Sequence, residues 1–224
     1  MTTDSSSDSA AARLATIRDD IARAAAAARR DPAGIELVAV SKTHPAEAIE
    51  PLLGAGQASF GENRVQEAQA KWPALRRTDT RLHLVGQLQS NKADDAVELF
   101  NVIHSVDRPR LVDALARAMD KAGRRPDCFI QVDVGEEPQK GGVALADLPS
   151  LLATARDAKL PVVGLMCVPP ADVEAAPYFA LTAKLARDHG LAGLSMGMSS
   201  DYETAVMLGA TVVRVGTALF GSRG

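Results

Sequence analysis

The stretch IELVAVSKTHP, residues 35–45, is the part of the sequence on which the choice of fold depends. Leu37–Val40 is an apolar run typical of a buried strand, and it stops at the polar turn SKT (41–43). A doubly wound dinucleotide-binding sheet would carry G-x-G-x-x-G after its first strand, and this turn does not contain it. What this turn does contain is a lysine, Lys42. It follows the first strand, at the edge where a parallel sheet places its active site.

The rest of the chain alternates short apolar runs with longer stretches of helical pattern. We expect strands at Glu36–Val40, Ala58–Phe60, Leu82–Val85, Val102–Ser105, Cys128–Val134, Val162–Cys167, Gly193–Met196 and Thr211–Val215. We expect helices at Ala46–Leu53, Arg64–Leu75, Lys92–Leu99, Arg110–Lys121, Leu145–Ala158, Ala175–Asp188 and Tyr202–Leu208. Such a chain belongs to the α/β class, and eight strands favour a closed (β/α)₈ TIM barrel. An open doubly wound sheet is the alternative.

Two segments precede the first strand. ARLATIRDDIARAAAAARR (12–30) is rich in alanine and has apolar residues at helical spacing, so we expect an extra N-terminal amphipathic helix. MTTDSSSDSA (1–10) is acidic and serine-rich, which predicts a disordered tail. The remaining residues, 11–224, are then expected to form a single domain, a size that fits one barrel.

Composition narrows the possible functions. The net charge of -3 gives no reason to expect nucleic acid or an anionic membrane as a partner, and no apolar stretch approaches the length of a membrane span. Cys128 and Cys167 lack CxxC spacing and lie in or beside apolar runs, which indicates reduced core thiols in a cytoplasmic protein. No cluster has metal-ligand spacing, so no metal is expected. We expect His83 and His104, on predicted strands, to be buried.

Polar residues gather after the last two predicted strands. Ser195 and Ser199 belong to the loop after the seventh strand, and Gly216 and Thr217 belong to the loop after the eighth. Glycine lets the backbone approach an anion and hydroxyl groups add donors, so the two loops together predict a phosphate site. For the seventh loop, the alternative is a helix-capping box over residues 200–203.

Lys42 and Arg214 complete the predicted site. A lysine at the mouth of an apolar cavity is expected to be partly desolvated, which lowers its pKa and lets the neutral amine attack an aldehyde. With a phosphate site across the mouth, the ligand is a sugar phosphate, as in lysine-dependent aldolases, or pyridoxal 5′-phosphate (PLP). Arg214 ends the eighth strand, where it would keep a pyridine nitrogen unprotonated. The alternatives are a solvated lysine and a structural ion pair of the arginine.

Seven motifs support a more specific interpretation. They are AVSKTHP (39–45), FGENRVQEA (60–68), HLVGQLQSNK (83–92), QVDVGEEPQKGGV (131–143), GLMCVPP (164–170), LSMGMSSDYETAV (194–206) and VRVGTALFG (213–221). With these motifs the chain resembles the pyridoxal phosphate homeostasis proteins, whose fold is similar to the N-terminal barrel of alanine racemase. The resemblance implies an alanine-racemase-N-terminal-domain-like barrel, which is fold type III among PLP-binding proteins.

The resemblance also implies roles for particular residues. Lys42 would hold PLP as a Schiff base, Asn63 would lie beside the ring and Arg214 would face the ring nitrogen. The residues implied around the phosphate are Ser195, Met198, Ser199, Gly216 and Thr217. No residue is given a catalytic role.

The function implied by the resemblance is intracellular PLP homeostasis without strong catalysis, in a cytoplasmic monomer or weak dimer. PLP-dependent apo-enzymes are its candidate recipients. The alternative is a weak PLP-dependent amino-acid racemase that uses Lys42 as its base. Alanine racemases add a domain that supplies a catalytic tyrosine, whereas Tyr178 and Tyr202 of this chain lie in predicted helices. Efficient racemisation needs a second base, so the alternative is the weaker one.

Overall fold

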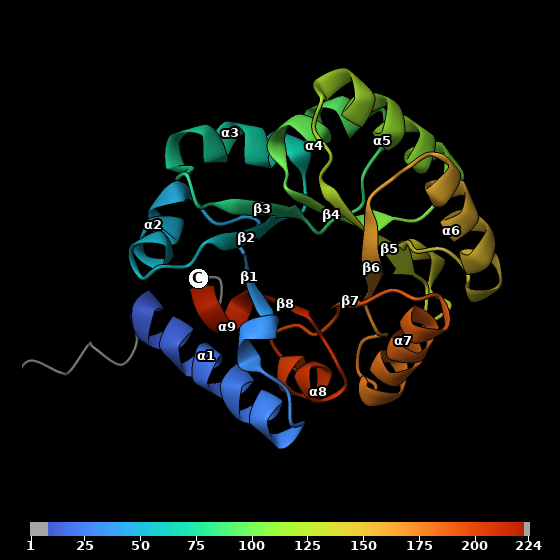
Figure 1. Ribbon diagram of the computed structural model, residues 1–224. Coiled ribbons are helices and arrows are strands. Elements are labelled where there is room, and N and C mark those ends of the chain that lie inside the picture. The colour runs from blue at the N-terminus through green and yellow to red at the C-terminus, as the bar shows by residue number, and fades with distance from the viewer. Residues whose placement is uncertain (1–8, 222–224) are drawn as a thin grey trace, which may run out of the picture.

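The structure, a computed structural model, describes residues 9–221. Eight parallel strands form a closed barrel in which each strand pairs with the next along the chain and the last pairs with the first (Figure 1). The strands are β1 (Glu36–Val40), β2 (Ser59–Glu62), β3 (Arg81–Leu84), β4 (Val102–Val106), β5 (Asp127–Val132), β6 (Val162–Cys167), β7 (Gly193–Ser195) and β8 (Val212–Val215). The predicted (β/α)₈ barrel is confirmed, and the open sheet is wrong.

Helices surround the barrel (Figure 1). They are α1 (Ala10–Ala27), α2 (Ala46–Gly54), α3 (Val65–Leu75), α4 (Ala93–Leu99), α5 (Pro109–Ala122), α6 (Leu148–Asp157), α7 (Ala176–Asp188), α8 (Tyr202–Met207) and α9 (Thr217–Phe220). Helix α6 begins later than predicted because the preceding residues form a separate 3₁₀ turn, Leu145–Asp147. Within residues 9–221, no helix is both long enough and apolar enough to cross a membrane.

Helix α1 lies outside the barrel and contacts α2, α8 and α9. It begins at Ala10, earlier than predicted, because the Ser9 side chain caps it by accepting a hydrogen bond from the backbone of the first turn. It ends at Ala27, and Asp31 then caps a short 3₁₀ turn that leads into β1. Residue 10, which we assigned to the disordered tail, is thus helical. Residues 1–8 of that predicted tail lie outside the described residues.

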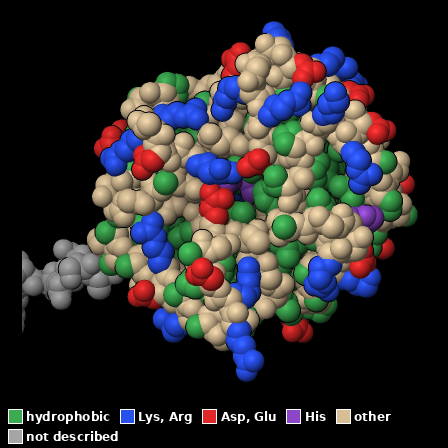
Figure 2. All heavy atoms as spheres, viewed as in Figure 1, with side chains coloured by type: hydrophobic (Ala, Val, Ile, Leu, Met, Phe, Trp, Pro, Cys, Tyr) green, Lys and Arg blue, Asp and Glu red, His purple; other side chains and the backbone are tan. Residues whose placement is uncertain are grey.

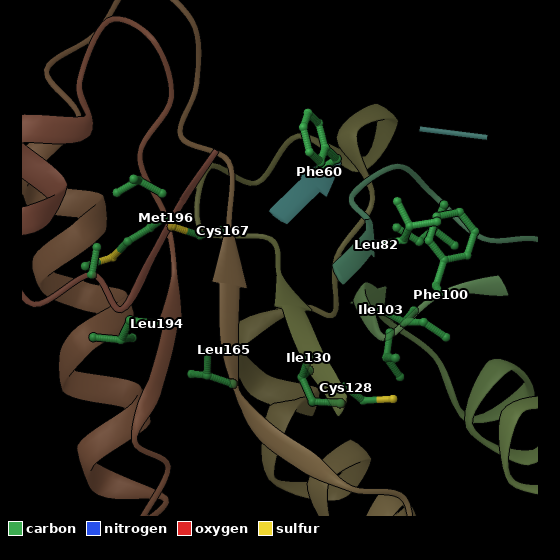
Figure 3. Packing of buried hydrophobic residues seen from close by; sticks show 14 of the residues in the cluster. Phe60, Leu82, Phe100, Ile103, Cys128, Ile130, Leu165, Cys167, Leu194 and Met196 are labelled. Carbon is green, nitrogen blue, oxygen red and sulfur yellow. The ribbon is translucent and has the colours of Figure 1, made fainter. Parts of the chain in front are cut away.

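The main core lies between the barrel and its helices, where side chains that point outward from the strands are buried. Figure 3 labels members of this layer, including Phe60 of β2, Ile130 of β5 and Leu165 of β6. The fully buried Trp72 of α3 packs on Phe60, with ring centroids 5.0 Å apart. Each large apolar side chain buried in this way stabilises the fold by about 1.5–3 kcal/mol. The layer therefore fixes the strands whose ends carry the site.

The interior of the barrel is mixed in character. A small apolar cluster consists of Val38, Val102, Phe129, Met166 and Val212. His83, His104, Ser195 and Arg214 are buried beside it. Barrel interiors are usually filled by branched apolar residues, so these polar groups must find hydrogen-bond partners inside the protein.

The burial of the two cysteines and the distribution of surface charge agree with what the sequence predicts. Cys128 and Cys167 are both free and buried, as predicted. Burial raises the pKa of both thiols, to about 11 for Cys167, so neither is a reactive thiolate at neutral pH. Figure 2 shows acidic and basic side chains interspersed over one face of the molecule, in keeping with the small net charge.

Candidate functional site

A cavity of about 520 Å³ opens at the carboxyl ends of the barrel strands. Seven of the eight predicted site residues line it: Lys42, Asn63, Met198, Ser199, Arg214, Gly216 and Thr217. The eighth, Ser195, is fully buried and is not part of the lining. Other lining residues add amide and amine groups, among them Gln87, Gln131 and Lys140. The barrel topology thus brings residues that are far apart in the sequence, from Lys42 to Thr217, together at the mouth of one cavity.

Lys42 lies just beyond β1, on a loop where Thr43 takes a positive φ of 63°. Its side chain is exposed, so our expectation of a desolvated amine is wrong. The strand ends before Lys42, which places the residue at the open rim of the cavity. Among the described residues, Lys42 Nζ has no hydrogen bond or ion pair, so its amine is available to a ligand.

The loop that carries Lys42 is fixed by Lys71 of α3. Lys71 Nζ donates hydrogen bonds to the carbonyl oxygens of Ser41, at 2.9 Å, and His44, at 3.0 Å. These carbonyls lie on either side of Lys42 in the chain. One buried cation therefore holds both ends of the short segment on which the amine is mounted.

Lys71 is itself paired with Glu62, the last residue of β2, at 2.8 Å. Glu62 is fully buried, and its Oε1 also accepts hydrogen bonds from Ser41 Oγ, at 2.7 Å, and Trp72 Nε1, at 3.0 Å. Within residues 9–221, its Oε2 has no hydrogen-bond partner. Our sequence analysis missed this pair. The available signal was a carboxylate in FGEN at an outward-facing strand position, beside apolar helix residues.

Asn63 follows β2 and lines the cavity, where it is held against the end of β3. A Cβ atom at Gly86 would lie only 2.3 Å from the backbone oxygen of Asn63. A glycine is therefore required at position 86 for the two loops to pack this closely.

The loops after β7 and β8 meet at Ser199. Its Oγ accepts hydrogen bonds from the backbone N–H groups of Gly216, at 3.2 Å, and Ala218, at 3.4 Å. Two backbone donors thus converge on one oxygen at the cavity wall. An anionic oxygen would suit the same donors.

The alternative reading of the seventh loop, a helix-capping box, is wrong. Helix α8 begins at Tyr202, and its N-cap residue Asp201 makes no side-chain hydrogen bond to the first turn. Asp201 Oδ1 instead accepts a hydrogen bond of 2.6 Å from the backbone N–H of Met198. This contact folds the SMGMS loop back and places Met198 and Ser199 at the cavity.

Arg214 reaches the cavity from inside the barrel and is only 4 % exposed. Its Nη1 donates to Ser195 Oγ at 2.6 Å, and its Nη2 donates to the carbonyl oxygen of Cys167 at 2.9 Å. No carboxylate of the described residues lies within ion-pair distance of it, so the predicted alternative of a structural ion pair is wrong. Burial lowers the pKa of Arg214, but a guanidinium keeps its proton at neutral pH. The cavity therefore contains a fixed positive charge.

Ser195 connects Arg214 to the two buried histidines. His104 Nδ1 lies 2.8 Å from Ser195 Oγ, and His83 Nδ1 lies 2.9 Å from His104 Nε2. Both imidazoles are fully buried, as predicted. Burial lowers the pKa of His83 and holds the pKa of His104 well below its ordinary value, so both rings are neutral at pH 7.

These histidines predict a loss of stability in weak acid. Below pH 6.5 the unfolded chain binds protons at His83 and His104, while the folded chain does not. Acidification therefore favours unfolding, and we expect the free energy of unfolding to fall by up to about 1.4 kcal/mol per pH unit for each histidine. Urea denaturation at pH 7, 6 and 5 measures the effect. His104→Gln should have a shallower slope, and a flat wild-type profile would contradict the prediction.

Comparison with known proteins agrees with this geometry. The chain matches the family described as "Alanine racemase, N-terminal domain" over residues 13–224. An alanine racemase from Bacillus anthracis shares the fold, with a TM-score of 0.65 and 19% identity over 94% of this chain and 56% of that one. The barrel and its cavity thus define a protein of the alanine racemase N-terminal-domain class.

More similar relatives make the assignment specific. The pyridoxal phosphate homeostasis protein of Pseudomonas aeruginosa is 42% identical over 94% of this chain and 97% of its own. PipY of Synechococcus elongatus, solved with PLP bound, is 42% identical with a TM-score of 0.83, over 95% of this chain and 100% of that one. The chain belongs to the family of pyridoxal phosphate homeostasis proteins.

Proposed function

We propose that this chain binds PLP in the cavity at the carboxyl ends of the strands and holds it as part of PLP homeostasis. The observation that carries the proposal is the convergence on one cavity of the Lys42 amine, the Arg214 guanidinium and the backbone donors around Ser199. PLP has an aldehyde, a ring nitrogen and a phosphate that match these three groups. The names of the relatives support the same ligand.

The loops around Ser199 fit the phosphate group. The N–H groups of Gly216 and Ala218 already converge on one oxygen atom, and Thr217 adds a hydroxyl at the same wall. Held by these two amides, the Ser199 hydroxyl would donate its proton to a phosphate oxygen. The carboxylate nearest in sequence, Asp201, accepts from the Met198 N–H, which partly neutralises its repulsion of an anion.

Lys42 would supply the covalent attachment. Its amine nitrogen would replace the oxygen of the PLP aldehyde, which leaves as water, to form a Schiff base. Because Lys42 is exposed, we attribute its reactivity to position. Contacts to the phosphate and the ring would hold the aldehyde beside the amine. In well-oriented systems such proximity lowers the free energy of activation by on the order of 7–11 kcal/mol.

Arg214 favours holding PLP over catalysis. Bound PLP acts as an electron sink mainly when its ring nitrogen is protonated, and an arginine at that nitrogen keeps it unprotonated. Within residues 9–221, no tyrosine lines the cavity, and the Tyr202 hydroxyl donates to Asp20 Oδ2 of α1 at 2.7 Å. We therefore propose a protein without strong catalytic activity.

We also propose a cytoplasmic setting, a monomer or weak dimer, and PLP-dependent apo-enzymes as recipients of the cofactor. Two free, buried thiols support a reducing compartment. The exposed position of Lys42 supports exchange of PLP with other proteins, since the attachment point is open to solvent.

Titration of the purified protein with PLP, and in parallel with pyridoxal, tests the proposal. We expect a visible absorption band that saturates with PLP, and much weaker binding of pyridoxal because it lacks the phosphate. A protein that stays colourless with PLP would overturn the proposal. Equal affinity for the two aldehydes would show that the Ser199 loops do not bind phosphate.

Ser199→Ala provides the matching test of the phosphate site. The substitution removes the hydroxyl that organises the Gly216 and Ala218 amides, and we expect PLP affinity to fall about threefold to tenfold, the equivalent of one hydrogen bond. Pyridoxal binding should not change. Ser150→Ala, at an exposed position of α6 that does not line the cavity, is the control and should leave both affinities unchanged.

A further inference from the structure

Five side chains form a continuous file through the inside of the barrel, which we call the interior chain: Glu36, His83, His104, Ser195 and Arg214. They come from β1, β3, β4, β7 and β8. Starting from the cavity, the links are 2.6 Å from Arg214 to Ser195, 2.8 Å to His104, 2.9 Å to His83 and 3.2 Å to Glu36. The last is a close contact without linear hydrogen-bond geometry.

Only Arg214 of the interior chain lines the cavity, and the three central residues are fully buried. Glu36 is at the opposite end of β1 from the Lys42 loop, and its side chain is 31% exposed. There it accepts from Ser59 Oγ at 2.6 Å and lies 3.5 Å from Arg81 Nε. The file therefore joins the cavity floor to the opposite end of the barrel.

The two ends determine which atom donates at every link. Arginine can only donate, so Ser195 Oγ must accept from Arg214. Glu36 keeps its charge, because contacts with His83, Ser59 and Arg81 outweigh the effect of burial and lower its pKa. A carboxylate can only accept, so the nitrogen that faces it, His83 Nε2, must carry a proton.

The remaining protons follow from neutral imidazoles. His83 carries its one proton on Nε2, so its Nδ1 accepts from His104 Nε2–H. His104 Nδ1 then has no proton and accepts from the Ser195 hydroxyl. Every donor in the interior chain points away from the cavity and toward Glu36. The opposite direction would leave the hydroxyl proton of Ser195 without an acceptor and set a lone pair against the Glu36 carboxylate.

We propose that His83 and His104 are positioning residues for Arg214, each fixed as the Nε2–H tautomer by the carboxylate of Glu36. By accepting the hydroxyl proton of Ser195, His104 turns the oxygen lone pairs of Ser195 toward the guanidinium. Phe129 stacks on the His104 ring, with centroids 4.7 Å apart, and keeps the imidazole in this orientation. The effect on bound PLP rests on the proposed function, in which Arg214 faces the ring nitrogen.

Nitrogen-15 NMR of the ligand-free wild-type protein tests the proton assignment directly. With labelled histidine, the ring couplings of His83 and His104 should show two neutral Nε2–H tautomers at pH 7. His44 and His189, the other histidines in the sequence, are assigned by single His→Gln variants. An Nδ1–H tautomer or an imidazolium at either of the two remaining histidines, His83 and His104, would overturn the inference. This measurement requires neither PLP nor a variant of the interior chain.

Titration of His104 variants with PLP tests the effect on Arg214. His104→Leu removes the acceptor for Ser195, and we expect a shifted absorption band and an affinity lower by about threefold to tenfold. His104→Asn restores an acceptor near the Nδ1 position, and it should recover most of the wild-type band position and most of the affinity for PLP. Borohydride should still attach PLP to Lys42 in each variant.

The outcomes separate the two claims. If wild-type protein fails to bind PLP, the proposed function fails, while the tautomers can still be measured. If wild-type protein binds PLP and a folded His104→Leu variant has an unchanged band and affinity, the positioning role is wrong and the binding function stands. Circular dichroism establishes that the variant is folded. A shift that His104→Asn does not rescue would indicate a packing effect and would also contradict the inference.

Discussion

Lys42→Ala is expected to abolish the visible band of the PLP-loaded protein, because no amine would remain at the point where the aldehyde is held. The contacts of Arg214, Ser199 and Gly216 are left in place. PLP should therefore still bind, but non-covalently, with affinity lower by at least about 100-fold, or about 2.7 kcal/mol. Titration monitored by absorbance and by displacement of PLP measures both effects.

Reduction with borohydride identifies the attachment point. In wild-type protein, peptide mass spectrometry should place the reduced PLP on Lys42. Lys92→Ala is the matched control: its amine lies 3.4 Å from Asp95 and does not line the main cavity, so the visible band should be unchanged. A label on Lys92, or a full visible band in Lys42→Ala, would contradict the assignment.

The barrel could be predicted because each unit of the chain carries its own local signal. β1 and β6 have the predicted bounds, since the apolar run of β1 ends at the polar turn 41–43 and that of β6 ends just before Pro169 and Pro170. α1 and α6 differ at their ends because side-chain capping at Ser9 and a 3₁₀ turn before Leu148 act there, and neither leaves a periodic pattern. The site followed from the rule that functional groups gather at the carboxyl ends of barrel strands.

What sequence reasoning missed depends on side-chain direction and on contacts between distant segments. Ser195 and Ser199 look alike in the SMGMSS segment, but Ser195 is inside the barrel and Ser199 is at the cavity. The exposure of Lys42 depends on the residue at which β1 ends. The pairing of Glu62 with Lys71 is formed between a strand and the next helix, and each charge alone would read as a surface residue.

Glu62→Ala is expected to destabilise the fold by about 3–5 kcal/mol, because it removes the closer and fully buried partner of Lys71 and leaves that cation with only the partly exposed Glu67. The Lys71 side chain is only 9% exposed, so its charge cannot move far into water. Trp72 Nε1 and Ser41 Oγ would lose the same acceptor. Urea denaturation at neutral pH measures the loss.

Glu67→Gln is the matched control for this prediction. Glu67 contacts the same cation at 3.3 Å, but its side chain is 28% exposed. Partly exposed ion pairs contribute about 1 kcal/mol or less, so this variant should be close to wild type in stability. A loss as large as that of Glu62→Ala would show that burial is not the deciding difference between the two carboxylates.

A double-mutant cycle separates the ion pair from the other contacts of Glu62. Glu62→Gln keeps an acceptor for Trp72 and Ser41, and Lys71→Met removes the cation while it keeps an aliphatic side chain. Each single variant leaves a charged or polar group buried without its partner, whereas the double variant removes both charges. We therefore expect the double variant to be more stable than the sum of the single losses predicts, by about 1–3 kcal/mol. Additive losses would mean that the 2.8 Å contact between Glu62 and Lys71 contributes no coupling.

Because Lys71 also holds the carbonyls of Ser41 and His44, both variants without Lys71 should attach PLP to Lys42 more slowly, even where the stability of the double variant is recovered.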